Sequence, residues 1–413
     1  MNRFAALCVV LSTGVSAQRQ MSLADCELAF QENNLQLLAE QYSVSMADAD
    51  ILQAKIWELP QVSGYINAIN PQDHRVFDAG RAKGAEITQL IYMGGKKKNE
   101  IAFAKSNKEL SQLQFAQLLV DLRSQLRANF FDLYFEKLKL ANTERQLGYL
   151  NDLLKSYKTQ LKKGNVSLKD EVRLQSIVIQ LGNDRVEISK EMAELEQGLK
   201  LLTGLSDDLD PEISDEEIKN MIAVQPFGDV SVLKRKALEN NSDYLFYLKL
   251  IDNAKLFAQW QRSLNVPDLN IGAEYDQASG TFNNEINLKI AIPLPLWKVN
   301  KGNVQKADFA IRQNQLKAEY HKLDLETKVH AAYKTWESQY QQLLSIKSED
   351  LENHDLVYEG MVKNFRNGNV SLIEFADFMD SYRQTALQIY DLKTELLLSA
   401  EQLNQLVQTK IFY

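Results

Sequence analysis

The residue types that most often carry catalysis or bind metals are sparse in this sequence. Its four histidines are His74, His321, His330 and His354, and they show no metal-ligand spacing. The chain also has no glycine-rich phosphate loop, no nucleophile elbow and no motif of paired catalytic carboxylates. These observations argue against an enzyme, and they predict neither a cofactor nor a metal site.

The first 17 residues have the three parts of a secretory signal peptide. Arg3 precedes an apolar run over 4–11, and small residues at 15–17 provide a cleavage site. The apolar run is too short to span a bilayer, and a buried N-terminal helix is the alternative interpretation. Beyond this segment Cys26 is the one remaining cysteine, so the mature chain cannot form an intramolecular disulfide.

The net charge and the distribution of apolar residues argue against two classes of protein. The 413 residues have a net charge of −8, which argues against a nucleic-acid partner. No run of 18 or more apolar residues follows the signal, so we expect no membrane-spanning helix.

The positions of the prolines predict very long helices. The seven prolines leave residues 72–210 and 296–413 without any, and apolar residues recur there in steps of three and four. These stretches resemble coiled-coil seams. A helix from about 96 to 163 would be on the order of 100 Å long, so its apolar stripes must be covered by neighbouring helices.

An internal repeat divides the chain into two similar halves. Glu-Asn-Asn at 32–34, Pro60 and Gly95 recur 207 residues later, and Gly-Asn-Val-Ser-Leu at 164–168 recurs unchanged at 368–372. We therefore predict a first repeat over 18–205, an acidic linker over 206–228 and a second repeat over 229–413. Each repeat should contain helices, a β-hairpin (about 61–93 and 268–292) and a long helical hairpin (about 96–203 and 300–410).

The predicted strands have two unlike faces, which is the argument for a membrane. Val62 and Ile66 alternate with Ser63 and Tyr65, and the other three strands repeat the pattern. A small soluble sheet with one buried face would show the same alternation. Four strands cannot close a barrel, and open edges are not tolerated in lipid, so a membrane barrel requires association. Three chains would supply twelve strands.

This series of elements, with its two Gly-Asn-Val-Ser-Leu turns, resembles the TolC-like outer-membrane efflux and secretion duct family. The resemblance covers essentially all of the mature chain, and the segment 290–303 looks most like the metal and drug efflux branch. It implies a mainly α fold with a helical tunnel, and a homotrimer sharing a twelve-stranded barrel in the outer membrane of a Gram-negative bacterium. It also implies a large periplasmic portion, a periplasmic adaptor protein and an inner-membrane pump as partners, and passive export as the function.

The resemblance also places a gate at the periplasmic tip turns, which contain Gly164, Asn165, Asp170, Gly368 and Asn369. Family members narrow the entrance with acidic rings, and the matching residues here are Glu374 and Asp377. Many also pair an acidic residue, here Asp170, with a tyrosine and an arginine, but this chain has Phe365 and Val370 at those positions. A different contact, for example through Arg366, must then hold the tip.

Basic and aromatic residues follow the second and fourth strands. We expect them at the periplasmic membrane interface, in contact with lipid head groups. They are Lys96, Lys97, Lys98, Trp297 and Lys298.

Three alternatives remain open from the sequence. The gate and interface residues could be ordinary solvated charges, the whole chain could be a soluble periplasmic adaptor or coiled-coil rod, and the duct could serve type I protein secretion.

Overall fold

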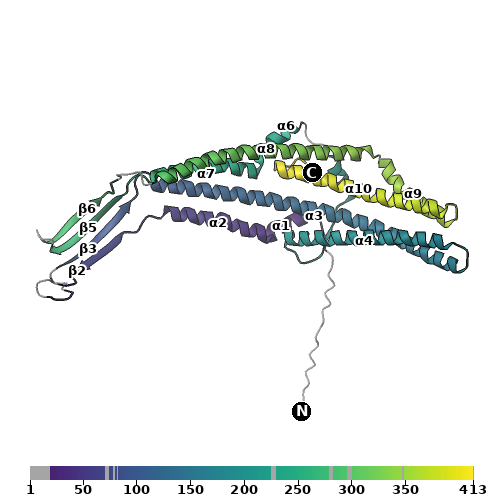
Figure 1. The fold of residues 1–413 in the computed structure, drawn as a ribbon, viewed down its shortest axis with the longest axis horizontal. Helices are drawn as coiled ribbons and strands as arrows, with labels where there is room; N and C mark the ends of the chain where they lie inside the picture. The colour runs from purple at the N-terminus through teal and green to yellow at the C-terminus, as the bar shows by residue number, and fades with distance from the viewer. Residues whose placement is uncertain are drawn as a thin grey trace, which may run out of the picture. The chain divides into compact units, whose positions relative to one another are not determined.

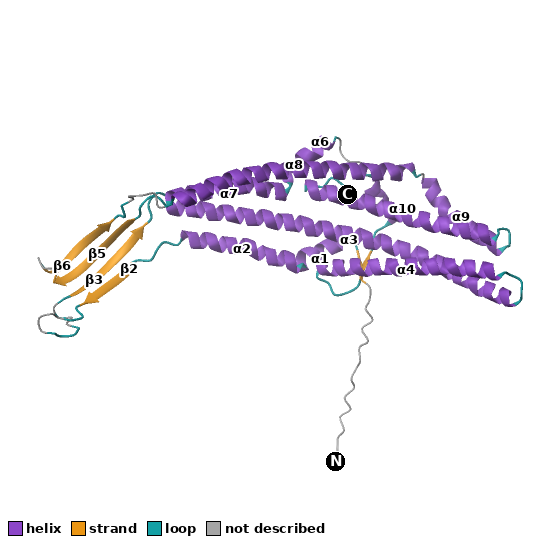
Figure 2. Ribbon diagram, in the orientation of Figure 1, coloured by secondary structure: helices purple, strands orange, loops and turns teal. Residues whose placement is uncertain are grey.

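The computed structural model describes residues 19–69, 74–77, 80, 82–224, 229–278, 282–294, 300–346 and 348–412. The predicted signal at 1–17 and the interface residues Trp297 and Lys298 lie outside these ranges. Helices predominate and the strands are few (Figure 2), so the prediction of a mainly α fold with four strands in one sheet is confirmed.

The described part of the chain forms ten helices (Figure 1). They are α1 (Leu23–Asn33), α2 (Leu35–Lys55), α3 (Lys96–Lys162), α4 (Leu168–Thr203), α5 (Asp215–Ala223), α6 (Val230–Asn240), α7 (Ser242–Ser263), α8 (Lys301–Ser345), α9 (Ser348–Arg366) and α10 (Leu372–Val407). The 67 residues of α3 are one uninterrupted helix, about 100 Å long at 1.5 Å per residue. None of the described helices is long and apolar enough to cross a membrane.

The strands form two separate sheets. They are β1 (Arg19–Met21), β2 (Gln61–Ile66), β3 (Lys83–Ile91), β4 (Leu209–Pro211), β5 (Leu269–Ala278) and β6 (Asn283–Ala291). Strands β1 and β4 pair in parallel, whereas the larger sheet is antiparallel in the order β2-β3-β5-β6. Its central pair, β3 and β5, joins the two predicted hairpins.

Contacts divide the chain into two compact units that do not follow the two repeats. The first contains residues 1–38, 118–240 and 325–413, and the second contains 39–117 and 241–324. Each unit therefore contains segments of both repeats. Helices α3 and α8 each run from one unit into the other.

The repeated Glu-Asn-Asn segment starts helices. Asn34 Oδ1 accepts a hydrogen bond from the Leu37 amide at 2.8 Å, and Asn241 Oδ1 accepts one from the Tyr244 amide at 2.9 Å. Both asparagines thus serve as N-caps, satisfying an amide that the helix leaves unpaired. Ser22 and Asp25 have the three-residue spacing of a capping box, and they form one at the start of α1.

The second long helix is interrupted where one helix was expected. The sequence predicted a helix from about 300 to the turn at Gly368, but α8 ends at Ser345 and α9 starts at Ser348. Gly95 and Gly164 are 69 residues apart, whereas Gly302 and Gly368 are 66 apart. Removing three residues from a helix removes less than one full turn, so the apolar face on the far side is rotated by about 60°. A break between α8 and α9 is a way to accommodate this rotation.

Candidate functional site

The larger sheet has one polar face and one apolar face along its whole width. One row of directly paired residues is Val62, Ile87, Ala273 and Leu288, and the adjacent row is Ser63, Glu86, Glu274 and Asn287. The alternation within each strand therefore stays in register across all four strands. Much of the apolar face is open: Leu288 is 85% exposed and Ile290 is 74% exposed.

Polar side chains on the sheet bridge neighbouring strands. Lys289 Nζ lies 2.9 Å from Glu274 Oε2 and 3.3 Å from Glu86 Oε1, which joins three strands on the polar face. The Tyr65 ring lies over Gly84, where a Cβ atom would come within 2.4 Å of it. The absence of a Cβ atom at Gly84 lets the tyrosine ring lie there, and any other residue would force the ring to move.

The sheet presents two open edges. Strand β2 pairs with β3 and strand β6 pairs with β5, and neither has a second neighbour among the described residues. Strands with free amides and carbonyls are templates for another strand. The sheet is thus equipped to continue into other chains.

The two helical hairpins of the first unit end in identical turns. Gly164 and Gly368 both have φ of 76°, and the amides of Asn165 and Asn369 each donate to a carbonyl five residues back at 3.0 Å. This geometry is a Schellman motif, which needs a left-handed residue and therefore favours glycine. The Gly-Asn pair ends one helix and the serine that follows starts the next.

The acidic residues predicted at the gate have different surroundings. Glu374 is exposed and forms a capping box: its carboxylate accepts from the Ser371 amide at 3.0 Å, and its own amide donates to Ser371 Oγ at 3.3 Å. These hydrogen bonds lower the pKa of the Glu374 carboxyl. Asp377, one turn further, is 3.0 Å from the guanidinium of Arg173 on α4.

The acidic residue of the first turn has a local role. Asp170 Oδ2 accepts from Ser167 Oγ at 2.7 Å, within the cap of its own helix. Phe365 is buried and stacks on Phe375 with ring centroids 4.2 Å apart, and Val370 packs at the margin of the same core. The tip is therefore packed by aromatic rings at the positions where tyrosine and arginine were absent.

Arginines secure this aromatic core at its edges. The Arg366 guanidinium lies 4.8 Å from the ring centre of Tyr149. The Arg145 guanidinium donates to the Tyr382 hydroxyl at 3.0 Å and lies over Tyr358. Arg383 binds Asp184 at 2.7 Å, a second ion pair between α4 and α10.

Several of these residues could not be identified from chemistry alone. Arg173 carries no motif, but it lies 204 residues before Asp377, which is the offset of the repeated turns. Comparing the two repeats position by position would have singled out this pair. The contacts of Arg383 and Arg145 have no such signal, because they depend on how α10 packs.

The predicted interface lysines divide among three environments. Lys96 is buried and its ammonium lies 2.7 Å from Asp268, Lys97 lies in a pocket beside Glu100, and Lys98 is exposed. The ammonium of Lys96 therefore forms an ion pair within the chain and is shielded from solvent.

Part of the chain matches a known protein family. The family model described as outer membrane efflux protein matches residues 233–408. The matched segment lies within the predicted second repeat, 229–413. The family resemblance inferred from the repeats and turns is thus confirmed.

One relative is similar to this chain in sequence, and two solved structures are similar to it in fold. The chain is 24% identical over 277 residues to the cobalt-zinc-cadmium resistance protein CzcC of Cupriavidus metallidurans, an alignment covering 67% of this chain and 63% of that protein. The solved structure of CusC has a TM-score of 0.75 at 16% identity, covering 93% of this chain and 91% of that one. The CmeC outer membrane channel of Campylobacter jejuni has a TM-score of 0.73 at 14% identity, covering 93% and 85%.

Charged groups inside the first unit predict a dependence of stability on pH. Burial, together with the neighbouring carboxylate of Glu136, raises the pKa of the Asp132 carboxyl to about 6. Glu136 is itself buried, and burial raises its pKa as well. Ionisation of Asp132 therefore costs stability in the folded chain.

We expect Asp132→Asn to stabilise the protein at neutral pH. Because the pKa is about 6 in the folded chain and 3.8 as the ordinary value, the cost appears as pH rises from about 4 to about 6. The variant should gain at most about 3 kcal/mol near pH 7 and nothing below about pH 4. Chemical unfolding at both pH values measures this, and an equal gain at both would attribute the effect to packing instead.

Proposed function

We propose that the chain is one protomer of a trimeric duct in the outer membrane of a Gram-negative bacterium, giving substrates of a tripartite efflux system a passive exit. The observation that carries this proposal is the two-faced sheet with two open edges. Three copies would supply twelve strands and leave no edge unpaired, with the apolar face toward lipid and the polar face toward a water-filled lumen.

Exposed apolar stripes on single helices support association. On α8 the exposed side chains recur at helical spacing, and so do those on α2. They are Phe309, Leu316, Tyr320 and Leu323 on α8, and Tyr42, Met46 and Leu52 on α2. Stripes of this kind need cover from other helices, which further copies of the chain provide.

The proposed duct works without catalysis. Among the described residues no group of three or more metal-ligating side chains is gathered that could hold a metal ion. An inner-membrane pump and a periplasmic adaptor would supply the energy and the selection of cargo, and the duct would supply a path.

The charge on the polar face favours cations as cargo. Its described strand residues include four carboxylates and one lysine: Glu86, Glu274, Asp276, Glu285 and Lys289. A lumen with excess negative charge attracts cations and repels anions. The CzcC relative is named for resistance to cobalt, zinc and cadmium, and divalent metal cations would suit this lumen.

Association with the membrane is the direct test of the duct. The mature protein should resist release by osmotic shock, require detergent for extraction, and have the mass of three chains afterwards. It should then conduct ions in planar bilayers. Release without detergent would instead identify a soluble adaptor or rod.

The gate proposal concerns Glu374 and Asp377. Both carboxylates are exposed and stand three residues apart, which places them on one face of α10. Three copies would bring six carboxylates to the entrance, where they would attract divalent cations.

A double variant can separate the charge of the gate from the helix cap. Glu374→Gln keeps the capping box, since glutamine serves at this position, while removing the charge. Combined with Asp377→Asn, it should weaken block by divalent cations about tenfold or more, because a charged contact is worth about 1.5 kcal/mol or more. Ser371→Ala is the control, as it removes the cap and keeps both charges. Unchanged block in the double variant would exclude these residues from the constriction.

A further inference from the structure

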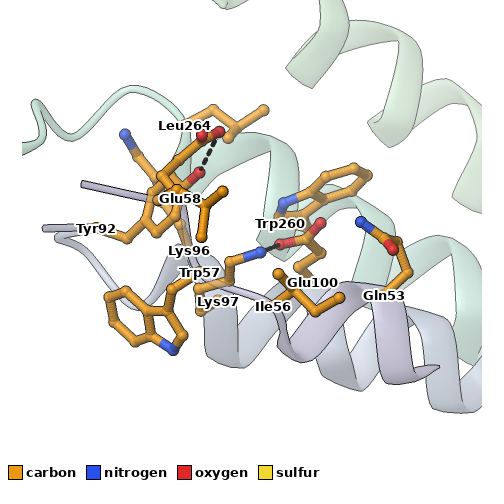
Figure 3. A pocket seen from close by; sticks show the side chains of 11 residues that line it. Gln53, Ile56, Trp57, Glu58, Tyr92, Lys96, Lys97, Glu100, Trp260 and Leu264 are labelled. Atoms are coloured by element: carbon orange, nitrogen blue, oxygen red, sulfur yellow. Dashed lines mark hydrogen bonds and ion pairs between the residues drawn. The ribbon is translucent and has the colours of Figure 1, made fainter. Parts of the chain in front are cut away.

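A pocket of about 490 Å³ lies where the helices of the second unit meet the sheet. It is formed by the end of α2, the connection to β2, the first residue after β3, the start of α3 and the end of α7 (Figure 3). Its lining combines aromatic rings, apolar side chains and charged groups, which is the composition of a site for an amphiphile. Such a site would meet lipid only at the proposed membrane location.

The charges in this pocket leave one carboxylate without a basic partner. Lys97 Nζ is 2.9 Å from Glu100 Oε2 and donates to the Ala54 carbonyl at 3.2 Å. Lys96 is neutralised by Asp268. Glu58 accepts a hydrogen bond from the Tyr92 hydroxyl at 3.2 Å but has no lysine or arginine beside it in the described part of the chain. The pocket therefore has one uncompensated negative charge.

Aromatic rings surround this carboxylate. The ring centres of Trp57 and Tyr92 are 5.7 Å apart, and Trp57 is 51% exposed. Trp260 lines the same pocket (Figure 3). Faces of tryptophan and tyrosine attract cations, and the Lys97 ammonium already lies over the Tyr92 ring, 5.2 Å from its centre. The half-exposed Trp57 ring is therefore the aromatic surface offered to a second cation beside Glu58. The pocket is complementary to a positively charged group.

An apolar hollow of about 460 Å³ begins next to this pocket. It is lined by Pro60, two residues after Glu58, and by side chains of the apolar sheet face such as Ile87, Leu288 and Ile290. Gln89 links the two sites: it lines the hollow, and its amide donates to the Glu58 carbonyl at 3.0 Å. A molecule with a cationic head and an apolar tail would occupy both.

We propose that this pocket binds the primary amine of a phosphoethanolamine lipid head group, with an acyl chain in the adjacent hollow. The amine donates to the Glu58 carboxylate and lies against the ring of Trp57, since Lys97 already lies over Tyr92. A primary ammonium has three donors for a carboxylate, whereas a choline has none, so hydrogen bonding favours ethanolamine. Phosphatidylglycerol offers no cation and is disfavoured.

Lipid retention by the full-length mature protein tests this. The protein is reconstituted into nanodiscs containing equal amounts of phosphatidylethanolamine, phosphatidylcholine and phosphatidylglycerol, extracted in mild detergent, and analysed by native mass spectrometry. The wild type should retain phosphatidylethanolamine preferentially. Glu58→Gln should lower that retention about tenfold, because a charged hydrogen bond is lost. Asp50→Asn is the control. It removes an exposed carboxylate of α2 that is not among the lining residues of the pocket, and lipid retention should not change.

Trp57→Leu provides a second variant, expected to lower retention of phosphatidylethanolamine without altering that of phosphatidylglycerol. Equal retention of the three lipids by the wild type would overturn the proposal, as would unchanged retention in Glu58→Gln. A Glu58→Gln variant that changes only the trimer–monomer equilibrium would show that a second copy covers the pocket, which also overturns it. Conductance of the wild type is measured separately, so loss of the lipid site and failure of the duct proposal give different results.

Discussion

Replacing both Arg173 and Arg383 with alanine is expected to raise the open probability of the proposed duct about tenfold. These arginines form the two ion pairs that join α4 to α10 near the tip, with Asp377 and with Asp184. The first pair is largely exposed and contributes little, whereas the second is mostly shielded from solvent and contributes more. A combined loss of about 1.4 kcal/mol corresponds to the tenfold change.

Single-channel recording in planar bilayers measures this effect. Arg185→Ala is the matched control, because Arg185 is an exposed arginine on α4 without an ion pair in the described part of the chain. If the double variant and this control conducted alike, the two ion pairs would not restrain the tip. High salt should also raise the open probability of the wild type, more through the exposed pair than through the shielded one.

Replacing Phe375 with alanine is expected to cost about 3–5 kcal/mol of stability. Its side chain is fully buried, stacks on Phe365 at 4.2 Å and meets the edge of the Tyr149 ring. Truncation would leave a cavity between the two helical hairpins, which cannot close because the surrounding rings are held on separate helices. Chemical unfolding followed by circular dichroism measures the loss.

Ile373→Ala is the control for this substitution. Ile373 is two residues away on the same helix and is half exposed, so its truncation should cost well under 1 kcal/mol. Limited proteolysis provides a second measurement: cleavage near the 368–371 turn should accelerate in the phenylalanine variant alone. Similar losses in both variants would indicate that α10 is sensitive to truncation in general.

The sequence predicted the elements well where the signal was local. The absence of proline and the apolar periodicity located α3 to within a residue of its observed end at Lys162. Alternation placed the strands and their two faces, because a period of two is independent of what the strand packs against. The Ser22–Asp25 capping box is equally local, because its partners are three residues apart.

Features that depend on distant partners were not predictable. The interruption after Ser345 has no proline or glycine to signal it, and only the shorter spacing of the second repeat hinted at a change. The aromatic core of the tip, including Tyr149 and Phe375, was indistinguishable from ordinary apolar positions. The pocket around Glu58 combines residues near 53–59, 92–100 and 260–264, which only the fold brings together.

The ion pair between Arg173 and Asp377 joins equivalent positions of the two repeats, 204 residues apart. Had both copies kept the same residue, like charges would have faced each other, and two identical hairpins would have repelled. Divergence to opposite charges made each hairpin the preferred neighbour of the other kind. Because this pair is largely exposed, its contribution is small, and it favours contact between unlike hairpins without fixing their order.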